Sequence, residues 1–235
     1  TDFWKLQHSK IKFDHARIEK SQFSDSSAEL AFFNSILNDV DMRSLQDTSS
    51  LTFEKSELKE VNTDRSALTL LRVANSRIDA TFKNAKIDRM EFENSELDTS
   101  LSESEITSLL VASSKIKTLR MNSVKMDSVV IRECEHTKNF GFYKATVRKI
   151  DIEKSRLSDF DMAKTSVETL RINDSTLSNS DFEELKVKSA TLEKVTLDGK
   201  VDFTNARIDQ FVAKNITKLP GLNLITTGSN VKFSD

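Results

Sequence analysis

Apolar residues recur at every fifth position along this chain, and small residues stand two places before many of them. The clearest run reaches from Phe53 to Ile131 and resumes over Phe142–Ile208, with an earlier run over Phe3–Phe23. An α-helix cannot use this spacing, because five residues turn about 140° beyond one revolution and would spread the apolar side chains around its surface. A strand can, since residues i and i−2 point to the same side. The pattern therefore predicts short strands, each with one face turned inward, joined by corners.

Positions twenty residues apart also match, which predicts that successive strands close into coils that stack on one another. One inward column would be apolar, comprising Leu58, Ile78, Leu97, Ile116, His136, Leu157, Leu177 and Leu197. The column two places earlier would be small, comprising Ser56, Ser76, Ser95, Ser114, Cys134, Ser155 and Ser175. We therefore expect an all-β solenoid with about 20 residues per coil, whose core consists of such columns.

Several segments resemble the pentapeptide-repeat family, in which Phe or Leu stands at the centre of each repeat and Ala or Ser two places before it. They are FEKSEL (Phe53–Leu58), FKNAKI (Phe82–Ile87), FENSEL (Phe92–Leu97) and FTNARI (Phe203–Ile208). The resemblance covers nearly the whole chain and implies a right-handed parallel β-helix with four sides. We accordingly predict a pentapeptide-repeat solenoid over residues 1–218, irregular at 24–51 and 137–141, and a C-terminal cap over 219–235.

The leucine-rich repeat is the rival fold. The segment VETLRINDSTL (Val167–Leu177) fits the leucine-rich pattern closely. That architecture needs roughly 20–29 residues per unit with a different second half. Here the same pattern returns after ten residues, which favours the pentapeptide solenoid.

Composition limits the class of protein further. The chain has 4 Gly and 1 Pro in 235 residues, so its turns must be built without many glycines, which suggests one turn type used repeatedly. Its 35 Lys+Arg balance 37 Asp+Glu, which argues against steering toward nucleic acid or anionic lipid. No apolar run approaches the ~20 residues of a membrane span. One cysteine excludes an internal disulfide framework, and the compartment, cytoplasmic or secreted, stays open.

No residue pattern indicates catalysis. Cys134 and His136 would be inward neighbours on one strand, but a metal site needs three or four ligands, and His8 and His15 lie many coils away. The repeated serines have no base beside them, so we expect their hydroxyls to bond the backbone or one another. We predict no catalytic residue, no metal and no cofactor, and thus no enzyme.

Two outward aliphatic residues are the first candidate for contact with a protein partner. Leu110 and Val130 fall one coil apart on the same side, where neighbouring coils offer Glu91 and Asp151. Two exposed aliphatics ringed by charge are the start of a contact patch. The alternative is ordinary, because single apolar side chains are common on protein surfaces.

The segment TKNFG (Thr137–Gly141) interrupts the ladder and supplies a second candidate. It could present Lys138, Asn139 and Tyr143 to a partner, since loops often carry binding residues. The interpretation we favour is a one-residue bulge in which Gly141 eases the corner.

The ends of the predicted solenoid raise a question of assembly. The N-terminal part starts directly in repeat-like sequence with Phe3 and Trp4, which leaves open strand edges. A further segment, Trp4 itself or a second copy could cover that end, so an end-to-end homodimer is one of the arrangements to test.

These observations favour a non-catalytic scaffold that mediates protein–protein interaction, alone or as a module of a larger protein. Some members of the resembled family mimic DNA and bind type II topoisomerases, which needs an acidic face. Here the outward column beside the serines alternates in sign through Glu57, Arg77, Glu96, Lys115, Glu135 and Arg156, which also disfavours nucleic-acid binding. A carbohydrate-active solenoid enzyme would need aromatic platforms, and the chain has 1 Trp and 1 Tyr.

Overall fold

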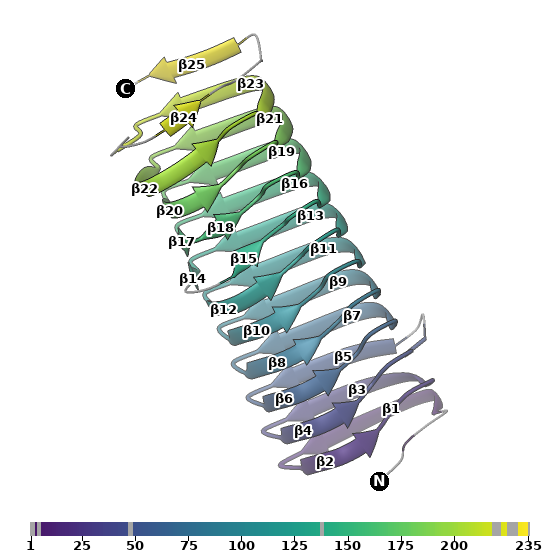
Figure 1. Cartoon of the computed structure of the whole chain (residues 1–235). Helices are drawn as coiled ribbons and strands as arrows, with labels where there is room; N and C mark the ends of the chain where they lie inside the picture. Colours follow the sequence, from purple (N-terminus) through teal and green to yellow (C-terminus); the bar gives the residue numbers. More distant parts are fainter. Residues whose placement is uncertain are drawn as a thin grey trace.

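The chain winds into a single stack of parallel strands. A computed structural model describes residues 3, 6–46, 49–136, 139–217, 222–224 and 230–234. Over these residues it is a parallel β-solenoid of about ten turns with about 20 residues per turn (Figure 1). The predicted all-β solenoid is confirmed. The leucine-rich-repeat alternative is wrong, because successive coils contribute strands to two sheets that both run the length of the solenoid. Within the described residues, no helix is long and apolar enough to cross a membrane.

Two sheets carry all the described strands. The 12-stranded sheet contains β1 (Gln7–Asp14), β3 (Ser27–Phe33), β5 (Ser49–Glu54), β7 (Ala67–Ala74), β9 (Lys86–Glu93), β11 (Glu105–Ala112), β13 (Lys125–Arg132), β16 (Thr146–Glu153), β19 (Ser166–Asn173), β21 (Lys186–Glu193), β23 (Arg207–Lys214) and β25 (Asn230–Ser234). The 13-stranded sheet contains β2 (Arg17–Gln22), β4 (Ile36–Asp41), β6 (Glu57–Asn62), β8 (Arg77–Thr81), β10 (Glu96–Ser100), β12 (Lys115–Arg120), β14 (Glu135–His136), β15 (Phe140–Gly141), β17 (Arg156–Ser158), β18 (Phe160–Asp161), β20 (Thr176–Asp181), β22 (Thr196–Phe203) and β24 (Leu222–Leu224).

The strand register reproduces the predicted columns. Leu58 pairs with Ile78, and Ile78 pairs with Leu97. Every member of this apolar column, including His136, is at most 3% exposed. Phenylalanines also stack between coils, and the rings of Phe182 and Phe203 lie 4.5 Å apart. Because each inward side chain packs on its counterparts one coil above and below, the core is continuous along the whole rod.

The corners are formed by residues in the left-handed backbone region. Among the described residues, 27 that are not glycine have φ between 47° and 62°, and they recur at equivalent corners from coil to coil, as at Asn75, Asn94 and Ser113. Of the described glycines, only Gly199 adopts this conformation. The described corners thus place residues other than glycine in this conformation, as the low glycine content suggested.

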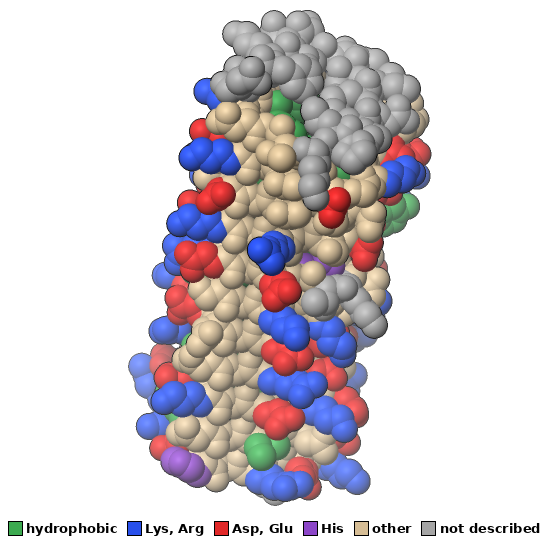
Figure 2. Space-filling view, turned by 90° about the vertical axis from the view of Figure 1, so that its left-hand side faces the viewer, with side chains coloured by type: hydrophobic (Ala, Val, Ile, Leu, Met, Phe, Trp, Pro, Cys, Tyr) green, Lys and Arg blue, Asp and Glu red, His purple; other side chains and the backbone are tan. Residues whose placement is uncertain are grey.

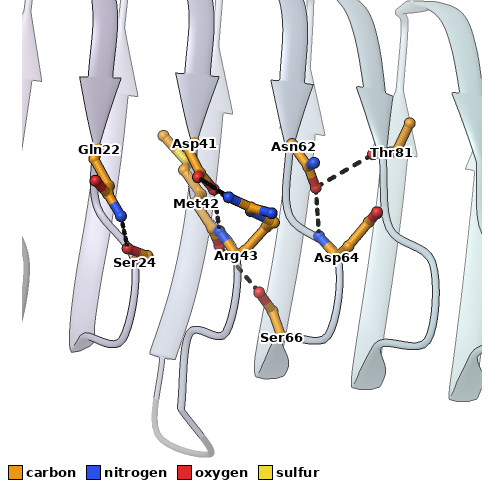
Figure 3. A network of polar contacts seen from close by, with 9 residues as sticks. All are labelled: Gln22, Ser24, Asp41, Met42, Arg43, Asn62, Asp64, Ser66 and Thr81. Atoms are coloured by element: carbon orange, nitrogen blue, oxygen red, sulfur yellow. Dashed lines mark hydrogen bonds and ion pairs between the residues drawn. The ribbon is translucent and has the colours of Figure 1, made fainter.

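Polar side chains close the corners of the 13-stranded sheet. The Asp41 carboxylate accepts a hydrogen bond from the Arg43 backbone amide at 3.0 Å, and the Asn62 side-chain oxygen accepts one from the Asp64 amide at 3.0 Å (Figure 3). Such Asx turns offer the chain a local hydrogen bond at the point where the ladder stops.

The stretches predicted to be irregular continue both sheets. Strands β3 and β4 lie within the 24–51 stretch and pair with their neighbours on either side. In the predicted cap over 219–235, β24 and β25 pair with β22 and β23. Pro220, Gly221 and Trp4 lie outside the described residues, so the cap remains a prediction.

Candidate interaction surface

Leu110 and Val130 lie side by side on the outer face of the 12-stranded sheet. Leu110 on β11 pairs directly with Val130 on β13. Glu91 precedes this pair on β9, and Asp151 follows it on β16. Both aliphatic side chains are half-buried rather than exposed, because neighbouring side chains shield them. Ile36, 42% exposed, is the only large hydrophobic residue classed as exposed in the described structure.

The surroundings of Leu110 and Val130 are neutral at the centre and charged at both ends. Ser108 and Ser128 stand beside them in the same strands and pair with each other. At one end Arg89 forms an ion pair with Glu91, and at the other Lys149 lies 3.7 Å from Asp151. We call Ser108, Leu110, Ser128 and Val130 the neutral patch. Across the coils it lies between two compensated ion pairs, and along β13 the exposed Arg132 follows two residues after Val130.

The structure does not bring Tyr143 to the neutral patch. Tyr143 lies in the turn after β15, where the Ser123 amide donates to its carbonyl, and the Lys144 ammonium lies 5.1 Å from its ring centre. Its side chain is half-buried, and Asn139 is exposed. Lys138 lies outside the described residues. Tyr143 therefore belongs to a different side of the solenoid from Leu110.

One residue is inserted between His136 and Phe140. Ile116 pairs with His136, twenty residues later, whereas Leu119 pairs with Phe140, twenty-one residues later. The residue after Phe140 is Gly141, and the neighbouring strand leaves no space for a side chain at this position. A Cβ atom there would lie 2.4 Å from the Asp161 carbonyl oxygen, so only glycine permits this approach of the two strands.

The serine column is structural. The Ser76 amide donates to Ser95 Oγ at 3.2 Å, and Ser95 Oγ donates to the Glu93 carbonyl at 2.7 Å. The Ser95 amide in turn donates to Ser114 Oγ at 3.1 Å. The expectation that these hydroxyls bond the backbone is confirmed.

Cys134 continues the serine column with sulfur in place of oxygen. Its Sγ donates to the Arg132 carbonyl at 3.2 Å, and its amide donates to Ser155 Oγ at 3.1 Å. Burial raises the pKa of the thiol, so the reactive thiolate is disfavoured. His136 is buried against the Phe140 ring at 5.2 Å. No group of three or more metal-ligating side chains occurs among the described residues.

Charges alternate along the outward column beside the serines. Glu57 pairs in register with Arg77, and the Arg77 guanidinium lies 4.0 Å from the Glu96 carboxylate in the next coil. Figure 2 shows side chains of opposite sign following one another along this side of the rod. The alternation compensates charge between coils and leaves no single-sign face in this column.

The five-residue spacing is present in the structure itself. Phe82, Ile87, Phe92 and Leu97 are at most 2% exposed, each five residues from the next. The described residues therefore form a parallel β-solenoid with a five-residue repeat.

Comparison with known proteins finds low similarity. No protein-family model and no curated protein matches the solenoid. The solved structure of full-length QnrB1, a plasmid-mediated fluoroquinolone resistance protein, is 12% identical, with a TM-score of 0.39 over 85% of this chain and 94% of that chain. HetL, a pentapeptide repeat protein involved in heterocyst differentiation regulation from the cyanobacterium Nostoc sp., is 13% identical, with a TM-score of 0.30 over 87% of each chain. At these values neither protein indicates what this solenoid binds.

A column of three carboxylates on the 13-stranded sheet was not among the predicted sites. Asp161, Asp181 and Asp202 pair in register on successive coils. Burial, and then the charge of Asp181, raises the pKa of Asp161. Hydrogen bonds from Thr204 and Lys200 lower the pKa of Asp202 to about 2. The spacing of these residues, twenty and twenty-one apart, is the sequence signal that places them in one column.

Proposed function

We propose that this solenoid is a non-catalytic scaffold that binds a protein partner through the neutral patch. The observation that supports this is the pairing of Leu110 with Val130 between two compensated ion pairs. Aliphatic groups flanked by compensated ion pairs can be desolvated at low cost, as the centre of a protein interface requires. Because the inward side chains pack on one another from coil to coil, the solenoid would be a rigid support, either alone or within a larger protein.

In this proposal Tyr143 would contact a protein partner at a second surface, separate from the neutral patch. Its half-buried ring and the nearby Lys144 ammonium lie on the turn after β15, away from the neutral patch. Aromatic rings with a polar end are favoured at interfaces. An end-to-end homodimer would use neither surface, so it can be tested independently by measuring the molar mass in solution.

The two alternatives have less support. A topoisomerase-binding DNA mimic needs an acidic face along the rod, whereas the carboxylate column covers three coils and the column beside the serines alternates in sign. A carbohydrate-active enzyme needs aromatic platforms near paired carboxylates. A supercoiling assay with purified gyrase and a screen of glycan cleavage should both be negative, and activity in either would replace the scaffold proposal.

The experiment is affinity capture from the native host's lysate with three baits, namely the wild-type chain, Leu110→Asp/Val130→Asp and Thr176→Asp/Thr196→Asp. The last is the matched control, because Thr176 and Thr196 are also half-buried outward neighbours one coil apart. A protein retained by the wild type and the control, lost from the first variant, and binding the purified wild type directly would support the neutral patch. Identical captures by all baits would contradict it.

A further inference from the structure

A second surface of the solenoid is a long groove on the outer face at the start of the strands of the 12-stranded sheet. It has a volume of about 750 Å³ and runs across seven coils, from β9 to β23. Its floor is the backbone around inward residues such as Ile106 and Val147, whose side chains are buried. The register is uniform along these seven strands, so the groove is unbroken. The groove begins at β9, where Lys86 and Asp88 flank its floor. In the preceding coil the equivalent residues are Ala67 and Thr69, whose side chains are shorter.

The two walls of the groove carry opposite charge. The residues just before the floor form the basic wall, whose cations are Lys86, Lys125, Lys186 and Arg207 and whose only carboxylate is Glu105. The residues just after the floor form the acidic wall, whose carboxylates are Asp88, Asp127, Glu168 and Asp209 and whose cations are Arg148 and Lys188. Charge is therefore separated across the groove, although the solenoid as a whole is nearly neutral.

Most ion pairs at the groove run along a wall rather than across the floor. Lys125 lies 3.7 Å from Glu105 within the basic wall, and Lys188 lies 2.9 Å from Glu168 within the acidic wall. Exposed pairs of this kind contribute little stability, so a ligand can exchange for them. Lys186 makes no ion pair with any other described residue.

The size of the groove fits one linear polymer. Seven coils at about 4.8 Å span about 29 Å, which is the length of about nine extended peptide residues at about 3.3 Å each. A polyanion such as a nucleic acid would be repelled by the acidic wall, and a polycation by the basic wall. A glycan would lack aromatic stacking, because no aromatic residue lines the groove.

We propose that this groove binds an extended polypeptide segment in which acidic and basic residues alternate. Side chains of an extended peptide point alternately to opposite sides. Such a segment would direct its carboxylates to the basic wall and its ammonium groups to the acidic wall. This proposal goes beyond the scaffold function through the neutral patch, because the groove shares no residue with that patch, and either proposal can fail without the other.

The test is fluorescence anisotropy with two labelled peptides of identical composition and about ten residues, long enough to span the groove. In the first peptide glutamate and lysine alternate, and in its block isomer all the glutamates precede all the lysines. The wild-type chain is compared with Lys86→Glu/Lys186→Glu, which inverts two exposed charges of the basic wall. The matched control is Lys154→Glu/Lys194→Glu, on the exposed turns that follow β16 and β21. Far-UV circular dichroism and a thermal melt verify that each variant is folded.

We expect the alternating peptide to bind the wild type at least ~10-fold more tightly than the block isomer, with affinity falling as salt rises. The groove variant should lose at least ~10-fold of that affinity, and the control should stay within ~2-fold of the wild type. Equal binding of the two peptides, equal binding by the groove variant, or no saturable binding of the alternating peptide would each overturn the proposal.

Discussion

At the scale of the residue, the corners depend on a backbone conformation that L-amino acids rarely adopt. A left-handed residue costs roughly 1–2 kcal/mol relative to the right-handed region, with Asn, Asp and Gly the least penalised. This chain places Lys, Glu, Ser and Arg there as well, as at Lys55, Glu60 and Arg65. The hydrogen bonds between adjacent coils at each corner hold these residues in place, as when the Lys55 amide donates to the Ala74 carbonyl at 3.0 Å. The solenoid therefore stores local strain that stacking offsets.

Ser123 provides a test of this strain. It has φ of 57°, and its side chain is exposed. Ser123→Val should lower the free energy of unfolding by about 1–2 kcal/mol, because a β-branched side chain crowds the left-handed backbone. Ser123→Asn should be neutral or stabilising. Urea denaturation measures both, and a valine variant as stable as the wild type would show that the corners are not strained.

At the scale of the element, neighbouring strands approach as closely as their outward side chains allow. Gly141 on β15 faces Asp161 on β18, and the missing Cβ permits the contact. The same outward position holds Ser100 and Arg120 in the two preceding coils. The inserted residue before Phe140 changes the register between coils. The glycine that follows Phe140 leaves room for the Asp161 carbonyl of the next coil.

Gly141→Ala should destabilise the protein by about 1–3 kcal/mol, because the added methyl group overlaps the Asp161 carbonyl. Hydrogen exchange should quicken first in β15 and β18. Ser100→Ala, at the same outward position two coils earlier, should change stability by less than about 0.5 kcal/mol. If Gly141→Ala changed stability as little as Ser100→Ala, the close approach of β15 to β18 would be contradicted.

The carboxylate column predicts opposite pH effects at two of its members. Asp161 has a raised pKa, so its ionised form costs stability at neutral pH, and Asp161→Asn should raise the melting temperature at pH 7. Asp202 has its pKa lowered to about 2, so its ionised form contributes stability above about pH 4, and that contribution disappears as the pH falls toward 2. Asp202→Asn should therefore lower the melting temperature at pH 7.

Both differences should shrink toward zero as the pH falls below the two pKa values. Thermal melts at pH 7, 4 and 1.5 measure them. Asparagine keeps the oxygen that accepts the Ala163 amide at 2.8 Å, so the substitution at 161 removes charge without removing that hydrogen bond. Effects of the same sign at Asp161 and Asp202 would contradict the assignment of burial as the dominant influence on Asp161.

At the scale of the whole molecule, the solenoid is a chain of nearest-neighbour interfaces. Every interior coil packs only on the coil before and the coil after it, so an interruption in the middle separates two stacks. Ile116 lies near the middle of the rod and is fully buried. Its column continues through Leu97 on one side and His136 on the other.

Ile116→Asp should unfold the protein at room temperature, because it places a carboxylate in the apolar stack. Glu96→Lys, on the outer surface of the adjacent coil, should alter the free energy of unfolding by less than about 1 kcal/mol. Far-UV circular dichroism measures both and should show strand with almost no helix for the wild type and for the surface variant. A folded Ile116→Asp protein would mean that the stack is not cooperative.

The candidate surfaces were only partly predictable. Leu110 and Val130 were expected to be neighbours because they are twenty residues apart, and the register agrees. Their half-burial was not predicted, because an outward position in the repeat does not state how far its side chain is covered. Tyr143, the separate second candidate, lies on the turn after β15.

The sequence alone determined the class of fold, the inward columns and the structural role of the serines. Five-residue periodicity is a local property, and a strand that must bury one face leaves few other arrangements for it. The sequence also predicted one extra residue between His136 and Phe142. Only the tertiary structure decided the approach of Gly141 to Asp161 and the separation of charge across the groove. Those features depend on which residues of different coils face one another, and a shift of one residue between coils changes every such pair.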